Sequence, residues 1–191
     1  MIAGVLLAAG AGTRFGGGKL RYPLPDGVPV GVAALRNLRA AVHQVVAVVR
    51  PGDDELRQLL EGEGVPVIEC ALADRGMGHS LAAGVAGSTD ADGWLIALGD
   101  MPLVQPRTIR TLAHALEQGS AIVVPVFGGK RGHPVGFSRR FRGELLALSG
   151  DAGARTVVTA HAAAVHRLDV DDPGVLQDVD TRADAERLAG R

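Results

Sequence analysis

The chain has 191 residues, a formal net charge of −1 and few aromatic side chains, namely four Phe, one Tyr and one Trp. This length favours one domain, residues 1–191, whose core is large enough to fold without disulfides or a structural metal. The near-zero charge and the scarcity of aromatic rings exclude a surface built for nucleic acid or for an anionic membrane. Cys70 is the single cysteine, which excludes an intrachain disulfide and is typical of cytoplasmic proteins.

Short apolar runs alternate with segments of helical periodicity along the first two thirds of the chain. The apolar start, residues 2–11, lacks a basic segment and is too short to span a bilayer, so it predicts a buried strand. Strands are predicted in chain order at 2–8, 45–49, 65–68, 94–98 and 121–124. Between them, helices are predicted around 32–42, 56–60, 81–85 and 109–116. This alternation predicts a three-layer α/β fold with a mostly parallel sheet.

The last third of the sequence changes character. Residues 124–137 contain a Gly-Gly turn and predict a small β hairpin or an extended flap. Further helices are predicted at 141–148 and 157–164, then a strand at 165–170 and a final helix at 181–188. No linker or repeat divides the sequence, which again favours a single domain.

A glycine-rich loop follows the first predicted strand. Five glycines lie between Gly10 and Gly18, with Arg14 among them and Lys19 directly after. Glycines let backbone N–H groups approach an anion, and the two cations add charge that can hold phosphates. The spacing fits neither the Rossmann fingerprint, whose third glycine would come one residue earlier, nor a Walker A loop, since position 20 is Leu. A flexible surface turn would explain the glycines but not the cations, so an anion-binding loop is favoured.

Two acidic segments are candidates for holding a metal ion. Asp100 follows the fourth predicted strand, so it faces the same edge of the sheet as the glycine loop. Mg²⁺ is commonly held by one or two carboxylates together with phosphate oxygens. A helix N-cap is the alternative for Asp100, although the distance to Pro106 is long for that role. Asp180 is the candidate for a second ligand, with Asp178 in reserve, and a capping role before the last helix is an equally good interpretation.

The motifs match a known family. Residues 7–16 together with Lys19 resemble the signature loop of MobA-like nucleotidyltransferases, and residues 99–102 resemble their metal-binding motif. Further segments are similar to one branch, the MocA-like molybdenum cofactor cytidylyltransferases, at 75–81, 131–134, 150–155 and 178–181. The resemblance spans nearly the whole chain in order. The sequence departs from the family at Phe15, where Met is common, at the extra glycines 17 and 18, and at Arg182, where Pro is usual.

The resemblance implies a Rossmann-like α/β/α nucleotidyltransferase fold, transfer of CMP from CTP to molybdopterin with release of pyrophosphate, and Mg²⁺ as cofactor. Carried over by position, the implied nucleotide-binding residues are Leu7, Ala8, Ala9, Gly10, Gly12, Thr13, Arg14, Lys19 and Ser80. The implied metal ligands are Asp100 and Asp180. Of these residues, Arg14, Lys19 and Asp100 are the catalytic candidates.

The molybdopterin acceptor is expected across the crevice, near the flap and the loop 151–155. The candidate acceptor-binding residues are Arg75, Gly132, His133, Pro134, Asp151 and Arg155. A turn position before proline is an equally good interpretation of His133, and a solvated helix charge is the alternative for Arg155. On this interpretation, residues 1–105 bind the nucleotide and residues 106–191 bind the acceptor, and a recipient molybdoenzyme is a further possible partner.

Three other functions stay open. One is a nucleotidyltransferase with another substrate pair, such as GTP with molybdopterin or a nucleoside triphosphate with a sugar or polyol phosphate. Another is a dinucleotide-dependent oxidoreductase, which the glycine spacing disfavours. The last is a chaperone that carries the molybdenum cofactor without catalysis.

Overall fold

The computed structural model describes residues 1–151 and 153–187. The strands are β1 (Ile2–Ala8), β2 (Gln44–Val49), β3 (Val67–Glu69), β4 (Gly93–Leu98), β5 (Ile122–Phe127), β6 (Lys130–Arg131), β7 (Val135–Ser138) and β8 (Val165–Asp169). The α-helices are α1 (Val30–Arg39), α2 (Asp54–Glu61), α3 (Met77–Ala86), α4 (Pro106–Glu117), α5 (Arg142–Leu146), α6 (Arg155–Ala160) and α7 (Arg182–Arg187). Every strand and helix predicted from the sequence has a counterpart, with ends shifted by a few residues; position 188, the predicted end of the last helix, lies outside the described residues.

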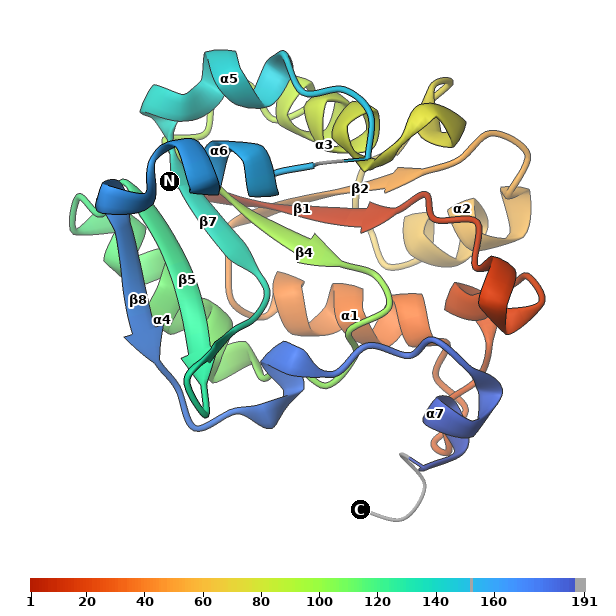
Figure 1. The fold of residues 1–191 in the computed structure, drawn as a ribbon. Helices are drawn as coiled ribbons and strands as arrows, with labels where there is room; N and C mark the ends of the chain where they lie inside the picture. Colours follow the sequence, from red (N-terminus) through yellow and green to blue (C-terminus); the bar gives the residue numbers. More distant parts are fainter. Residues whose placement is uncertain (152, 188–191) are drawn as a thin grey trace.

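One sheet passes through the centre of the molecule. Its strand order is β3-β2-β1-β4-β7-β5-β6, and β8 pairs with β5. Helices α1, α2 and α4 cover one face, and α3, α5 and α6 cover the other (Figure 1). Strands β1 to β4 are mutually parallel, so their carboxyl ends meet at one edge. The predicted three-layer α/β fold with a mostly parallel sheet is therefore confirmed.

Nearly every residue of the central strands is buried, and successive side chains enter opposite cores because each strand is covered on both faces. In β1, the side chains of Leu6 and Ala8 enter the core beneath α1, while Val5 and Leu7 enter the core beneath α3. In β4, Trp94 is fully buried, and its indole N–H donates to the hydroxyl of Ser88 at 2.9 Å. These apolar runs therefore form buried parallel strands rather than amphipathic ones.

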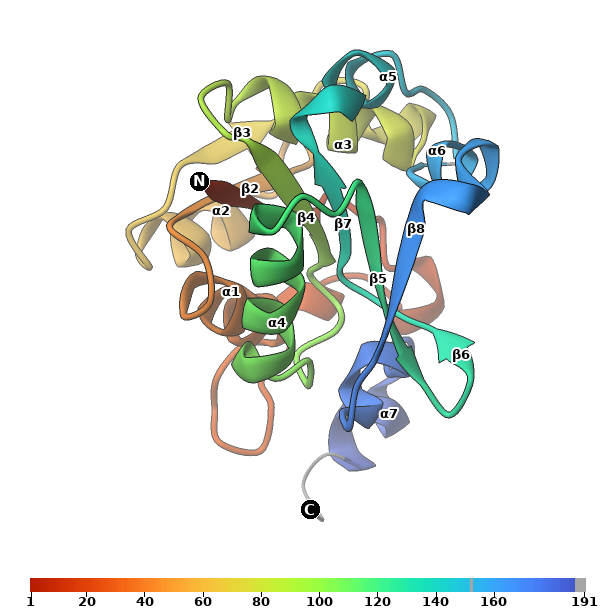
Figure 2. The same ribbon diagram turned by 90° about the vertical axis from the view of Figure 1, so that its left-hand side faces the viewer.

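The segment predicted as a hairpin or flap is divided between two structures. Lys130–Arg131 forms a short hairpin with the end of β5, which projects from the sheet (Figure 2). The rest joins the sheet, since β7 lies between β4 and β5 and is antiparallel to both. Phe137 is fully buried and pairs with Trp94 on one side and Ile122 on the other. The sequence pattern of residues 124–137 predicts extended structure, but it does not identify the strands with which β7 pairs.

Among the described residues, no helix combines the length and the apolar character that crossing a bilayer requires.

Close backbone packing holds the start of α3 against the loop that follows α5. A Cβ atom at Gly76 would lie 2.2 Å from the backbone carbon of Gly150, and Gly76 has a φ of +121°. The amide of Gly78 donates to the carbonyl of Gly150 at 2.8 Å. This contact places Asp151 next to the first turn of α3, at the candidate site described below.

We expect Gly76→Ala to lower the free energy of unfolding by about 2 to 4 kcal/mol. Overpacking costs about 1 to 3 kcal/mol and an unfavourable positive φ costs about 1 more. Gly119→Ala is the matched control, since Gly119 has a φ of +96° and nothing within 4 Å of its Cβ position. Urea denaturation of both variants separates the two costs; equal losses would show that contact with Gly150 is not the cause.

Candidate functional site

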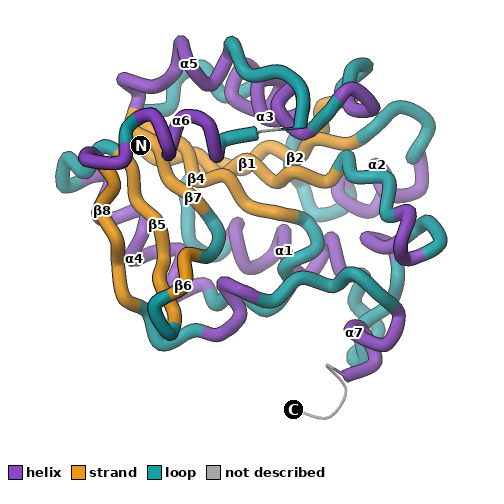
Figure 3. Tube along the Cα trace, viewed as in Figure 1, coloured by secondary structure: helices purple, strands orange, loops and turns teal. Residues whose placement is uncertain are grey.

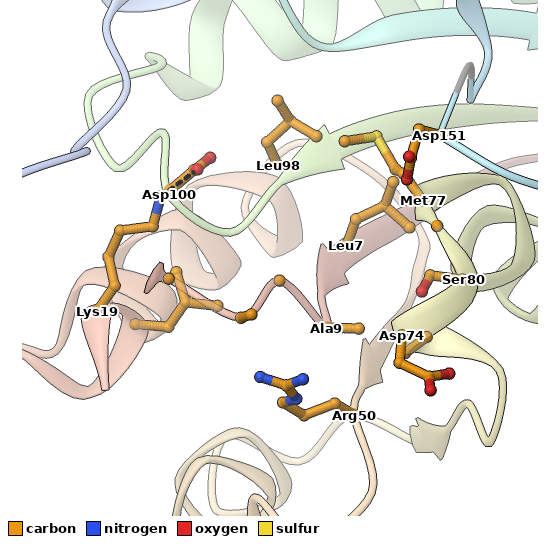
Figure 4. A pocket seen from close by; sticks show the side chains of 16 residues that line it. Leu7, Ala9, Lys19, Arg50, Asp74, Met77, Ser80, Leu98, Asp100 and Asp151 are labelled. Carbon is orange, nitrogen blue, oxygen red and sulfur yellow. Dashed lines mark hydrogen bonds and ion pairs between the residues drawn. The ribbon is translucent and has the colours of Figure 1, made fainter. Parts of the chain in front are cut away.

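A cavity of about 420 Å³ opens where β1 and β4 end, with β2 beside them. Its walls come from the loops that follow these strands and from the first turns of α3 (Figure 4). We call it the first cavity, and its lining residues are Leu7, Ala9, Gly10, Ala11, Gly12, Lys19, Leu20, Arg50, Ala73, Asp74, Gly76, Met77, Ser80, Leu98, Asp100 and Asp151. A crevice at the carboxyl ends of parallel strands is the expected place for a ligand in this type of sheet.

The glycine loop turns sharply over this edge. Gly12, Gly16, Gly17 and Gly18 all have positive φ angles, which residues with a Cβ rarely adopt. The loop is anchored by Phe15, which is buried and packs edge-to-face on Tyr22 with ring centroids 5.2 Å apart. The backbone is therefore shaped for a close approach, while the aromatic anchor holds it in place.

Six of the nine residues predicted to bind a nucleotide line the first cavity: Leu7, Ala9, Gly10, Gly12, Lys19 and Ser80. Ala8 points to the other face of β1 and is buried in the core beneath α1. Thr13 and Arg14 belong to the short helical turn of the glycine loop and lie outside the lining. The structure thus brings predicted residues from the end of β1, the glycine loop and α3 together around the first cavity.

Three carboxylates gather beside the cavity. One oxygen each of Asp100, Asp178 and Asp180 lies within 4.8 Å of the others. The segment between β8 and α7 runs back across the sheet edge to reach this place (Figure 3), and the amide of Val179 donates to the carbonyl of Asp100 at 2.8 Å. Because Val179 is buried, the residues on either side of it face Asp100. We call this group the carboxylate cluster.

The capping alternatives for these aspartates are filled by other residues. The start of α4 is capped by the buried Asp172, whose carboxylate accepts from the amide of Gln105 and the hydroxyl of Thr108. At the start of α7, Thr181 and Asp184 exchange hydrogen bonds, and Asp184 also accepts from the amide of Asp180. The carboxylate oxygens of the cluster are therefore not used to cap these helices.

Two cations already contact the carboxylate cluster. Lys19 Nζ lies 2.7 Å from an oxygen of Asp100 and 3.2 Å from an oxygen of Asp180. Arg14 Nη1 lies 2.6 Å from the other oxygen of Asp180, with its side chain 80% exposed against 14% for Lys19. Burial lowers the pKa of Lys19, but hydrogen bonds and attraction from Asp100 and Asp180 outweigh it, so this pKa lies above its ordinary value. Lys19 is thus a charged and mostly buried counterion of the cluster.

Comparisons with known proteins identify the family of this chain. Residues 4–165 match the family described as the MobA-like NTP transferase domain. The chain belongs to this family. The family predicted from the sequence motifs is therefore confirmed.

Relatives of this MobA-like protein match it over nearly its whole length. It is 31% identical to the purine catabolism protein PucB of Bacillus subtilis, covering 94% of this chain and 92% of PucB. It is also 31% identical to nicotine blue oxidoreductase of Paenarthrobacter nicotinovorans, covering 98% and 96% of the two chains. The crystal structure of Rv0371c from Mycobacterium tuberculosis H37Rv shares 34% identity with a TM-score of 0.85, covering 100% and 97%.

The predicted acceptor-binding residues of the MobA-like chain are dispersed. Asp151 lines the first cavity, whereas Arg75 is exposed on the turn before α3 and outside the lining. Arg155 lines a separate shallow hollow on α6, and position 152 of the predicted acceptor loop lies outside the described residues. Gly132 packs against the backbone of the 173–176 turn, where a Cβ would lie 2.3 Å from a carbonyl oxygen. Of these four residues, the structure brings only Asp151 to the cavity.

His133 and Pro134 lie below the end of β4, on the side of α1. Together with Leu98 and Met101 they line a small gap, and His133 Nδ1 is buried with no hydrogen-bond partner among the described residues. Burial, helped by repulsion from Arg131, lowers the pKa of His133, while attraction from Asp100 and Asp178 opposes this shift. His133 is therefore neutral at neutral pH.

The lowered pKa of His133 predicts a pH-dependent stability. As the pH falls through about 6.5, the unfolded chain binds a proton before the folded chain does, so stability falls. We expect His133→Gln to weaken this dependence between about pH 7 and the lowered pKa. Thermal unfolding of the apo protein across this range measures the effect, with the exposed His114→Gln as control; parallel curves for His133→Gln and wild type would refute it.

Several lining residues were not predicted from the sequence. Arg50 directly follows β2, and Asp74 and Met77 precede or begin α3. Arg50 could have been found, because the same rule that selected the loops after the first and fourth strands also applies to the second. Asp74 and Met77 carried no such signal, since their approach to the cavity depends on the packing of the α3 start against the 149–151 loop.

Proposed function

We propose that this protein transfers CMP from CTP to the terminal phosphate of molybdopterin and releases pyrophosphate. The observation that supports it most is the meeting of the glycine loop, Lys19 and the carboxylate cluster at one sheet edge, in a member of a nucleotidyltransferase family. Phosphoryl-type transfer depends mainly on positioning and charge neutralisation, and these groups supply both.

In this proposal the nucleotide lies along the first cavity. The ribose and base occupy the end bounded by Ala9 and by Ser80 of α3, and the triphosphate occupies the end at Gly12 and Lys19. A lysine ammonium has three N–H donors, and Lys19 uses two of them on Asp100 and Asp180. The third remains for a phosphate oxygen, so Lys19 can bind the nucleotide without leaving the cluster.

The donor set of the carboxylate cluster fits a hard divalent cation such as Mg²⁺. Three carboxylate oxygens lie within 4.8 Å of one another, and oxygen ligands of this kind suit Mg²⁺ and Mn²⁺. Asp100, Asp178 and Asp180 would hold the ion, so both aspartates of the 178–180 segment are proposed ligands. Bound there, it would supply charge that stabilises the phosphates. The related Rv0371c has a structure in complex with manganese, at 32% identity and a TM-score of 0.80.

The reaction needs no general base. A terminal phosphate oxygen of molybdopterin is already anionic, so it can attack the α-phosphorus directly while the bond to the bridging oxygen breaks. Arg14 and Lys19 would then stabilise the charge that builds on the pyrophosphate. Asp151 is the acceptor-side candidate at the cavity, and roles for Arg75, Gly132, His133, Pro134 and Arg155 stay predictions, as does the division at about residue 105.

Pyrophosphate release tests this function. The purified protein is incubated with Mg²⁺, molybdopterin and one of CTP, GTP, ATP or UTP. We expect release with CTP that depends on molybdopterin. Release with GTP alone would instead assign the guanine-using alternative, release with sugar phosphates a different acceptor, and molybdopterin binding without any release a carrier role.

One relative favours a second candidate function. Because nicotine blue oxidoreductase matches 98% of this chain, an oxidoreductase on the same scaffold is the alternative. The glycine spacing of the loop argues against a Rossmann-type dinucleotide site. Stoichiometric NAD(P) in the purified protein, or NAD(P)H oxidation with a quinone-like dye, would favour this alternative over nucleotidyl transfer.

A further inference from the structure

Arg50 stands on the wall between two cavities. A second cavity, of about 410 Å³, adjoins the first and shares with it Gly10, Ala11, Lys19, Leu20 and Arg50. It extends from there toward Gly17 and Gly18 of the glycine loop and toward the 51–55 segment that begins α2. Arg50 lies at this junction because it directly follows β2, the parallel neighbour of β1.

The positive charges around the two cavities differ in what they contact. Lys19 is paired with two carboxylates of the cluster, and Arg21 is paired with Asp53 and Glu55. Arg50 has no hydrogen bond or ion pair from its side chain within residues 1–151 and 153–187. Its guanidinium lies beside the segment after Ala9 and points away from Asp74 (Figure 4). Arg50 is therefore the cation at these cavities whose donors are uncommitted.

We infer that Arg50 binds the β- and γ-phosphates of the nucleoside triphosphate, the part that leaves as pyrophosphate; this rests on the proposed function. In the proposed function the nucleoside lies near Ser80 and the phosphates near Lys19, and the second cavity continues from Lys19 along the glycine loop. Terminal phosphates extending along that path meet Arg50. A guanidinium presents a planar fork of N–H donors that matches two oxygens of a phosphate.

In this arrangement Lys19 and Arg50 bind different phosphates of the nucleotide. Lys19 has one uncommitted donor and is tied to the carboxylate cluster, so it suits the phosphate at the reacting centre. Arg50, which lines both cavities, has its donors free to bind the leaving pyrophosphate and would favour nucleoside triphosphates over monophosphates.

Titration calorimetry with ligands of different phosphate number tests the inference. CTP and CMP are titrated, with Mg²⁺, into the wild-type protein, Arg50→Gln, Arg50→Lys and the control Arg140→Gln, whose arginine is exposed over Phe141. We expect Arg50→Gln to weaken CTP binding about ten- to a hundred-fold, as for loss of charged hydrogen bonds, and CMP binding less than about three-fold. Arg50→Lys should show an intermediate loss for CTP, and Arg140→Gln none.

Two outcomes overturn the inference. Equal losses for CTP and CMP would place Arg50 at the base, ribose or α-phosphate, and unchanged CTP affinity would exclude contact with the nucleotide. If the wild-type protein binds no nucleoside triphosphate, the proposed function fails instead. In that case inorganic pyrophosphate alone is titrated into wild type and Arg50→Gln: binding lost in the variant supports the anion site, and equal binding or none excludes it.

Discussion

Replacing Asp100 with alanine is expected to reduce turnover by at least about 10²- to 10³-fold, the usual cost of losing one preorganised electrostatic group at a reacting centre. Asp100 is the member of the carboxylate cluster that follows β4, and it also holds Lys19 at 2.7 Å. Its loss would remove one of the three proposed metal ligands and one of the two carboxylate partners of Lys19. Steady-state pyrophosphate release measures the turnover, and Mn²⁺ titration followed by electron paramagnetic resonance measures the metal site directly.

The fold should survive this substitution. The Asp100 side chain is 24% exposed, and Lys19 keeps Asp180 as a partner, so no charge is left unpaired. The control is Asp90→Asn, at an exposed turn before β4, whereas Asp100 follows the other end of that strand. Wild-type turnover in Asp100→Ala would refute the assignment of Asp100, whereas reduced turnover with lowered thermal stability in both variants would point to a general loss of folding.

Replacing Lys19 with glutamine should have opposite effects on two ligands. Binding of CTP is expected to weaken by about ten- to a hundred-fold, because a charged hydrogen bond to phosphate is lost. Binding of Mn²⁺ without nucleotide is expected to strengthen by roughly an order of magnitude. A unit charge a few ångströms away changes the electrostatic energy of an ion by about 1 to 4 kcal/mol. Lys19 contacts Asp100 and Asp180, so its positive charge would repel a divalent cation bound to the same carboxylates.

Lys130→Gln is the matched control, since Lys130 is the other lysine of the chain and is exposed on β6. It should change neither affinity. Weaker Mn²⁺ binding in Lys19→Gln would mean that this lysine organises the carboxylates rather than competing for them. Unchanged CTP binding would remove Lys19 from the phosphate site.

The features that the sequence predicts correctly are those determined by residues close together in the chain. Apolar runs of 2–8 and 94–98 identify buried strands, because covering a strand on both faces requires apolar side chains at every position. The glycine loop and Asp100 were predicted from their place directly after such strands. Parallel strands end at one edge, so this rule holds without knowledge of the strand order.

The features that were missed depend on contacts between distant segments. The position of β7 between β4 and β5 follows from its pairing with two strands, and the apolar residues 135 and 137 would suit other pairings equally well. The proximity of Asp178 to Asp100 depends on the anchoring of Val179, which fixes both neighbouring carboxylates at once. The spacing of residues alone therefore does not distinguish Asp178 from Asp180 as the second carboxylate beside Asp100.

The place of β7 beside β4 determines when the sheet can be completed as the chain leaves the ribosome. Strands β1 to β4 emerge first, but the far edge of β4 stays unpaired until Ser138 has been made. An open apolar edge is prone to association with other chains, so the early half is expected to need protection during this interval. The carboxylate cluster closes later still, when Asp180 arrives. A nascent or truncated chain would therefore hold Lys19 against Asp100 alone, without Asp180 as its second acidic partner.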